Sequence, residues 1–264
     1  MSELLPKIIV PFAPGTNCDQ DTIDAIELVG GDAEWVHVNE LTSGKSIEHA
    51  QGIIIPGGFS FGDDLGSGNV FSQILVNQLG DIVQEAVDQE MPVTGICNGF
   101  QVLVRSGLLP DAKLGQQTAS LTTNKSNKFE HRWVKMAFQE NHDCTWLQNI
   151  PEEDRIISLP SAHKEGRFVG SESTIQEIEE NNQVVLRYCD EFGEPTMEYP
   201  LNPNGSTLAI AGIAKKMIFG LMPHPERFVI PQQAENRHRF ASPDEIRPYG
   251  RVILGAMVDF IKES

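Results

Sequence analysis

The first half of the chain alternates between short apolar runs and longer segments in which apolar residues recur at helical spacing. The short runs are rich in Ile and Val and are followed by Gly, Pro or Asn, a pattern typical of buried strands. Such an alternation predicts a parallel sheet with helices on both faces. The predicted strands cover residues 7–12, 33–38, 52–58 and 92–97, and the predicted helices cover residues 17–31, 70–89 and 98–107.

The second half has apolar runs that follow one another with turn residues between them, which predicts more antiparallel strands. A closing amphipathic helix is expected at 249–263. The fold class is therefore α/β: a mostly parallel central sheet flanked by helices, with an antiparallel extension in the second half. Because the sequence has no internal repeat or flexible linker, one domain is expected over residues 1–264. The strands are expected at 131–138, 155–160, 184–189 and 207–214, and at the start of 217–228.

Composition, charge and cysteine spacing exclude several classes of protein. A hydrophobic content of 40% with 22% charged residues is ordinary for a globular protein. The net charge of −17 argues against a nucleic-acid or acidic-membrane partner. The four cysteines are scattered without a CxxC pair, which favours a reducing compartment. The chain lacks a signal-peptide pattern and any run of ~20 apolar residues, so a cytoplasmic protein is expected.

Cys97 ends the apolar run 92–97 and directly precedes a helical segment. Its sulfur is expected near the helix N-terminus, where free N–H groups and the helix dipole favour a thiolate. Gly95 and Gly99 flank it in a G-x-C-x-G pattern, the cysteine counterpart of the serine nucleophile elbow. On spacing alone, a nucleophile and an ordinary buried cysteine are equally good interpretations.

The segment "MPHPE" (222–226) follows another predicted strand. Its two prolines favour an extended backbone, in which His224 and Glu226 point the same way. That arrangement suits a histidine base oriented by a carboxylate. A single histidine after a strand is more often a surface or core residue, but together with Cys97 the pair predicts a Cys–His–Glu triad.

The glycine-rich segment 56–68 follows the strand residues 52–55 and should lie at the same sheet edge. Backbone N–H groups at Gly57 and Gly58 can approach a ligand closely. Together with the Asn98 amide they are candidates for an oxyanion hole. A flexible loop and a phosphate cradle are the alternatives, although no Lys-Ser/Thr follows in the P-loop arrangement.

Other titratable residues give weaker signals. Cys18 lies at a strand-to-helix turn like Cys97, but no His–acid pair is implied for it. His142 and Cys144 have an H-x-C spacing without further ligands, so no metal site is expected. The role of His163 is undecided on physical grounds.

These motifs together resemble a known family. "GICNGFQ" (95–101) with "MPHPE" downstream is similar to the class I, triad-type glutamine amidotransferases, whose nucleophile motif is G-x-C-x-G-x-Q. More narrowly, the chain resembles the glutaminase subunits of phosphoribosylformylglycinamidine synthase, an enzyme of purine biosynthesis. Lys164 and the long segment 228–250 depart from the family pattern. The segments that carry the narrower resemblance are 12–21, 56–68, 124–133, 162–168, 199–206, 210–213 and 221–227.

The resemblance implies a flavodoxin-like fold and a role for each candidate residue. Cys97 would attack the carboxamide of glutamine, the Gly58 and Asn98 amides would hold the oxyanion, and His224, oriented by Glu226, would move the protons. The remaining substrate contacts are implied for Gln101, Phe59, Ser60 and the stretch 120–124.

The resemblance also implies partners. The ammonia would pass to a separate ATP-dependent synthetase chain that makes formylglycinamidine ribonucleotide, with a small accessory subunit as a further partner. ATP and Mg²⁺ would be used by the synthetase, and this chain would need no cofactor. The alternatives are another cysteine hydrolase or amidotransferase of the same fold, or a non-catalytic regulatory relative.

Overall fold

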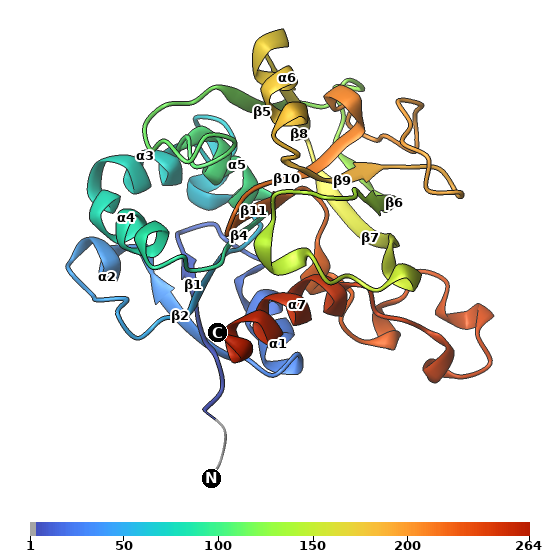
Figure 1. Ribbon diagram of the computed structural model, residues 1–264, viewed down its shortest axis with the longest axis horizontal. Coiled ribbons are helices and arrows are strands. Elements are labelled where there is room, and N and C mark those ends of the chain that lie inside the picture. Colours follow the sequence, from blue (N-terminus) through green and yellow to red (C-terminus); the bar gives the residue numbers. More distant parts are fainter. Residues whose placement is uncertain (1–3) are drawn as a thin grey trace.

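The computed structural model describes residues 4–264, and its main feature is a nine-stranded sheet (Figure 1). The strand order is β2-β1-β3-β4-β11-β10-β9-β6-β7, and β5 and β8 form a separate two-stranded ladder. The strands are β1 (Lys7–Phe12), β2 (Asp32–His37), β3 (Gly52–Ile55), β4 (Val93–Ile96), β5 (Ala119–Thr123), β6 (Glu130–Phe138), β7 (Ile156–His163), β8 (Glu165–Gly170), β9 (Val184–Tyr188), β10 (Ile210–Lys215) and β11 (Ile218–Leu221).

The sheet changes from parallel to antiparallel at β11. Neighbours from β2 to β11 pair in parallel, whereas β10, β9, β6 and β7 continue the sheet in antiparallel pairs. The predicted α/β architecture with an antiparallel extension in the second half is thus confirmed. The parallel part brings the carboxyl ends of β3, β4 and β11 to one edge of the sheet.

Helices cover both faces of the parallel part. Figure 1 shows α1 and α7 together on one side, with α3, α4 and α5 on the other. In the part of the chain that the structure describes, no helix is long and apolar enough to cross a membrane. The helices are α1 (Asp19–Leu28), α2 (Val38–Thr42), α3 (Asn69–Gln78), α4 (Gly80–Asp88), α5 (Asn98–Arg105), α6 (Glu172–Glu180) and α7 (Gly250–Glu263).

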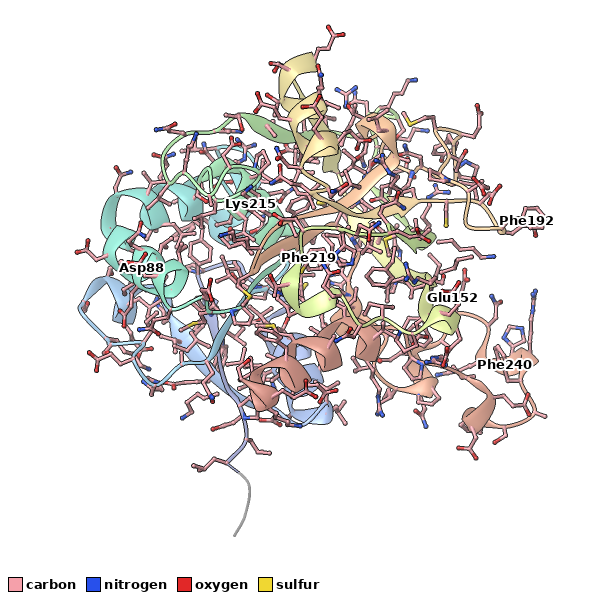
Figure 2. All side chains as sticks on the ribbon, in the orientation of Figure 1. Asp88, Glu152, Phe192, Lys215, Phe219 and Phe240 are labelled. Atoms are coloured by element: carbon pink, nitrogen blue, oxygen red, sulfur yellow. The ribbon has the colours of Figure 1, made fainter. Side chains whose placement is uncertain are left out.

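The hydrophobic core lies between the sheet and these helices. Alternate residues of a strand face opposite sides, so Ile8 and Ile9 of β1 are both buried, each under a different helix layer. Figure 2 shows Phe219 of β11 inside the molecule, whereas Phe192 and Phe240 lie at its periphery. Burial on both faces explains why the inner parallel strands, such as β1 and β3, are apolar runs in the sequence.

The single helix predicted over 70–89 is wrong, because α3 and α4 meet at Leu79. Leu79 has φ −118° and ψ 16°, outside the helical region, and its side chain is buried. Gly80 follows it, and glycine costs about 1 kcal/mol relative to alanine inside a helix. The break keeps the buried side chains of both helices, such as Phe71 and Ala86, against the core.

The strands β5 and β8 and the helix α6 were not predicted. β5 and β8 pair with each other, and both contain polar or glycine residues that weaken the alternation. The helix α6 contains only two apolar residues, Ile175 and Ile178, which are too few to establish a helical pattern in the sequence. The Ser171 hydroxyl accepts a hydrogen bond from the Thr174 N–H and caps the helix, a signal that could have revealed it.

Candidate active site

Three loops build the candidate site, and they follow the adjacent parallel strands β3, β4 and β11. Cys97 follows β4 directly, and His224 comes three residues after β11 ends at Leu221. Leu221 is in register with Ile96, and the Cys97 N–H donates to the Leu221 carbonyl at 2.8 Å. Sheet register therefore brings together two residues that are far apart in the sequence.

Cys97 occupies a strained turn between β4 and α5. Its φ of 51° and ψ of −102° lie in a region that residues other than glycine rarely adopt. The flanking glycines permit the turn: a Cβ on Gly99 would lie 2.0 Å from the Ile55 carbonyl oxygen, and one on Gly95 would lie 2.6 Å from the Gly99 oxygen. The backbone thus has the elbow geometry that the G-x-C-x-G spacing predicts.

His224 and Glu226 form a buried pair. The His224 Nδ1 lies 2.6 Å from the Glu226 Oε1, and each residue is 1% exposed. The expected contact is present, but the backbone reason differs from the one predicted. The residues Pro225–Arg227 form a 3-10 turn rather than an extended segment, and this turn folds the carboxylate back onto the imidazole.

The charges around His224 favour its protonated form. Burial alone would lower the pKa of His224, but the Glu226 carboxylate and the nearby Cys97 and Cys18 sulfurs raise this pKa well above its usual range. Among the described residues, the second ring nitrogen, Nε2, has no hydrogen-bond partner. The ring is therefore held at Nδ1 and can exchange a proton at Nε2.

Cys97 and His224 open into a cavity of about 300 Å³. Gly58, Phe59 and Gln101 also line it. This volume is at the lower end of the range for small-molecule sites.

The two backbone amides of the predicted oxyanion hole differ in position: Gly58 lines the cavity, whereas Asn98 does not. In the described part of the chain, neither the Gly58 N–H nor the Asn98 N–H donates a hydrogen bond to another residue. Gly58 has φ +127°, and a Cβ there would lie 2.6 Å from the Asn17 backbone nitrogen. Gly57 leaves room for the His224 ring, because a Cβ at position 57 would lie 2.8 Å from Cε1 of His224.

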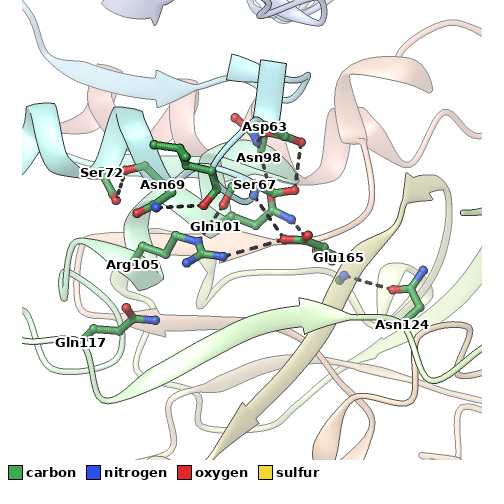
Figure 3. A network of polar contacts seen from close by, with 12 residues as sticks. Asp63, Ser67, Asn69, Ser72, Asn98, Gln101, Arg105, Gln117, Asn124 and Glu165 are labelled. Atoms are coloured by element: carbon green, nitrogen blue, oxygen red, sulfur yellow. Dashed lines mark hydrogen bonds and ion pairs between the residues drawn. The ribbon is translucent and has the colours of Figure 1, made fainter. Parts of the chain in front are cut away.

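A polar network surrounds the side chain of Asn98, and Figure 3 shows Asp63 and Gln101 beside it. The Ser60 hydroxyl donates to the Asn98 Oδ1 at 2.6 Å, and the Asn98 Nδ2 donates to Asp63 and to Gln101, at 3.1 Å each. The Gln101 Nε2 in turn donates to the Glu165 carbonyl. Ser60 is buried and is not among the cavity-lining residues, so it supports Asn98 and the start of α5. Burial raises the pKa of Asp63 in this network.

One wall of the cavity was not predicted. It consists of residues 162–165, at the junction of β7 and β8, together with Phe129 and His131. The stretch 120–124 does not line the cavity. Its last residue, Asn124, instead holds this wall: its side chain donates to the His163 carbonyl at 2.8 Å and accepts from the Gly166 N–H at 3.1 Å.

His163 is buried beside the site. Neither of its ring nitrogens has a hydrogen-bond partner among the described residues. Burial, reinforced by the charge of His224, lowers the pKa of His163 to about 3, so the ring is neutral at ordinary pH.

Cys18 belongs to the same cluster, although the sequence implied no His–acid pair for it. Its sulfur lies 2.9 Å from the Arg227 Nη2, which donates to it. The ligand atoms of Cys18, His224 and Glu226 all lie within 4.8 Å of one another. Two sulfurs, Cys18 and Cys97, therefore share one His–Glu pair.

The fold and the site define a class: an α/β protein with a cysteine on a strained strand-to-helix turn beside a buried His–Glu pair. The chain belongs to the family described as the CobB/CobQ-like glutamine amidotransferase domain, which matches residues 5–252. The family resemblance of the motifs is thus confirmed over nearly the whole chain.

Individual proteins similar to this chain point to one branch of the family. The phosphoribosylformylglycinamidine synthase subunit PurQ of Methanococcus maripaludis is 43% identical over 234 residues, which are 86% of this chain and 84% of the relative. The PurQ subunit of Methanosarcina acetivorans is 38% identical and covers 98% of this chain and 99% of its own length. Among solved structures, PurLQS from Thermotoga maritima matches with a TM-score of 0.72 and 30% identity, over 97% of this chain and 99% of that chain.

Proposed function

We propose that this chain is the glutaminase subunit of a phosphoribosylformylglycinamidine synthase. It hydrolyses glutamine to glutamate and ammonia and passes the ammonia to a separate synthetase chain. The observation that carries the proposal is the buried His224–Glu226 pair beside Cys97 on its elbow, in a chain 43% identical to a PurQ subunit.

Cys97 is the nucleophile in this proposal. Its sulfur forms a bond to the side-chain carbonyl carbon of glutamine, and the carbonyl electron pair moves onto oxygen. The free N–H groups of Gly58 and Asn98 support an oxyanion hole, because donors already fixed in place need no reorganisation as the charge develops. Asn98 is itself fixed by Ser60 and Asp63.

His224 moves the protons. Its imidazolium donates a proton to the departing nitrogen, the C–N bond breaks, and ammonia leaves a thioester on Cys97. Water then gives a proton to His224 and attacks the thioester carbon, which releases glutamate and restores the Cys97 thiolate. Glu226 orients the ring and stabilises its positive charge.

The substrate carboxamide lies at Cys97, and the rest of the glutamine extends into the cavity along Gln101 and Phe59. Gln101 is held by Asn98 and by the Glu165 carbonyl, so its position is fixed before substrate binds. Gly57 contributes by leaving room for the His224 ring.

The synthetase is a separate chain in this proposal, with the small accessory subunit as a further partner. Three exposed apolar side chains at and near the cavity mouth support a docking surface for the synthetase. This docking surface consists of Phe59, Leu65 and Phe129. ATP and Mg²⁺ serve the synthetase. The four unpaired cysteines support a reducing, cytoplasmic location.

Ammonia release from glutamine by the purified chain, with and without a synthetase, tests this function. A diazo-ketone analogue of glutamine should label Cys97 in proportion to the loss of activity, and Cys97→Ser should abolish glutamine-dependent amidine formation. Because the thiol forms the intermediate, the loss should be about 10⁴-fold or more. Labelling of Cys18 with Cys97 untouched would contradict the assignment.

A further inference from the structure

The cluster of Cys18, His224 and Glu226 offers a chemistry that glutamine hydrolysis does not use. Each side chain provides one atom of a kind that binds metals, these atoms lie within 4.8 Å of one another, and all three residues are buried. Cys18 precedes the first residue of α1 and is 1% exposed. We propose that these residues form an inhibitory site for Zn²⁺, with Cys18 as the ligand that distinguishes it from the catalytic triad.

The donor set fits zinc. A thiolate, an imidazole and a carboxylate are the three kinds of side chain that bind Zn²⁺, and three protein ligands leave a fourth position open. The thiolate and the carboxylate together neutralise the two charges of the ion, so a buried site gains no net charge. The Glu226 Oε2 has no hydrogen-bond partner among the described residues, and the Nδ1 of His224 faces the same carboxylate at 2.6 Å from its Oε1, so an ion beside this carboxylate reaches Nδ1 once the proton there has left.

Arg227 adds positive charge at this cluster, beside the imidazolium of His224. Its Nη2 donates to the Cys18 sulfur at 2.9 Å, and its Nε lies 3.9 Å from the Glu226 Oε1. The Arg227 side chain is 32% exposed and its Nε lies 4.0 Å from the Asp21 Oδ2, so the guanidinium can turn toward solvent and Asp21. Zinc binding therefore displaces the Arg227 guanidinium from the cluster. It takes Cys18 as a thiolate and His224 as a neutral imidazole, so the imidazolium proton of His224 and any proton on the Cys18 sulfur pass to water.

The cavity gives a zinc ion access to the cluster and explains why its binding would inhibit the enzyme. Cys18, Arg227, Cys97 and His224 all line it, so an ion that reaches Cys97 also reaches Cys18. Zinc bound to His224 and Glu226 takes the base away from Cys97 and stops proton transfer. The inhibition, though not the metal binding itself, rests on the proposed glutaminase function.

Metal binding is tested first without reference to activity. Co²⁺ is added to the Cys97→Ser variant, which leaves Cys18 as the thiol nearest to His224, and the thiolate-to-cobalt absorption is recorded. We expect one equivalent of Co²⁺ with this band, displaced by Zn²⁺. Cys18→Ser should lose the band although Cys97 is intact, and Cys144→Ser, a change at a buried cysteine outside the cluster, should keep it. A band that depends on Cys97 and not on Cys18 would overturn the proposal.

A second measurement guards against misfolding of Cys18→Ser. In the folded Cys97→Ser protein, Zn²⁺ should slow alkylation of Cys18 by at least tenfold, measured by mass spectrometry of the Cys18 peptide. Equal alkylation rates with and without Zn²⁺ would contradict the site. This experiment needs no substitution at Cys18.

Activity gives the third measurement, with each variant compared with its own metal-free rate. Cys18→Ser should raise the Zn²⁺ concentration for half-inhibition at least tenfold, and Arg227→Gln should lower it because the competing cation is gone. An unchanged value in Cys18→Ser would mean that zinc inhibits through Cys97 alone. If the chain releases no ammonia from glutamine, the cobalt and alkylation results still decide the metal site.

Discussion

The Nδ1 of His224 lies 2.6 Å from the Oε1 of Glu226, and the two side chains are removed from solvent together. A buried carboxylate is unfavourable unless a positive charge compensates it. The imidazolium of His224 is that charge, and the same attraction raises the pKa of His224 against the effect of burial. The pair therefore holds a proton beside Cys97, as the proposed mechanism requires.

Substitutions of His224 and of Glu226 should lower kcat by different amounts. His224→Asn removes the group that moves protons, so kcat should fall almost as far as in Cys97→Ser. Glu226→Gln keeps a neutral, hydrogen-bonding side chain beside an intact imidazole. It should retain roughly 10²-fold more activity than His224→Asn, because an orienting carboxylate contributes less than the groups that exchange protons. Wild-type turnover in His224→Asn would exclude the proposed triad.

The pH dependence of kcat/KM is expected to follow the His224 pKa. Its folded-state value is raised, so the imidazolium is present at neutral pH and is lost only as the pH rises through that value. The alkaline limb of the profile reports this loss. Glu226→Gln removes the carboxylate that holds the proton, so the alkaline limb should move to lower pH. An alkaline limb at the same pH in both proteins would show that it belongs to another group.

The oxyanion hole is tested at Gly58. A Cβ there would lie 2.6 Å from the Asn17 nitrogen, so Gly58→Ala must displace the loop that carries the proposed oxyanion donor. We expect kcat to fall by about 10²-fold, with a smaller change in KM. Gly44→Ala is the matched control: Gly44 also has positive φ, +93°, but a Cβ there meets nothing within 4 Å. It should cost about 1 kcal/mol of stability through backbone strain and leave kcat unchanged.

The elements of this site that the sequence predicts are those specified by short local patterns. Cys97, His224 and Gly58 each follow an apolar run that is buried on both faces, and parallel pairing brings such ends to one edge. The left-handed turn at Cys97 needs its two flanking glycines, which the G-x-C-x-G spacing displays. These features depend on residues close together in the chain.

The features that the sequence does not predict depend on long-range contacts. The hydrogen bond from Gln101 to Glu165 and the hydrogen bond from Arg227 to Cys18 each join distant segments. The wall at 162–165 depends on the ladder between β5 and β8, in which polar residues obscure the alternation. The break at Leu79 depends on how two amphipathic segments pack, which periodicity within either segment does not reveal.

His163 should make the protein sensitive to acid. Its pKa is about 3 in the folded protein, below the ordinary value of 6.5, so the unfolded chain takes up a proton first as the pH falls. Its contribution to the free energy of unfolding is full above pH 6.5 and decreases between pH 6.5 and about 3, by up to about 1.4 kcal/mol per pH unit. Urea unfolding between pH 7 and pH 4.5 should show a shallower slope for His163→Gln than for the wild type. The exposed His238→Gln variant should keep the wild-type slope, and equal slopes in all three proteins would contradict the prediction.

Coupling to the synthetase should appear as stimulation of the glutaminase. Free ammonia is lost to a cell, so a subunit of this kind should stay nearly idle until its partner is docked, and the loop 56–68 that carries Gly58 is the element whose alignment docking would complete. The glutaminase rate should rise by at least roughly tenfold, ~1.4 kcal/mol of barrier, when a synthetase and its nucleotides are added.

Leu65 lies on this loop at the proposed docking surface and is 71% exposed, which makes Leu65→Asp the variant that separates docking from chemistry. It should keep the unstimulated rate and lose the stimulation, because a buried charge disfavours association. Leu28→Asp, a change at an exposed leucine at the far end of α1, should be stimulated like the wild type. Ammonium salts should feed the synthetase in every case. Full glutaminase activity in the isolated chain, unaffected by any synthetase, would indicate a stand-alone glutamine hydrolase instead.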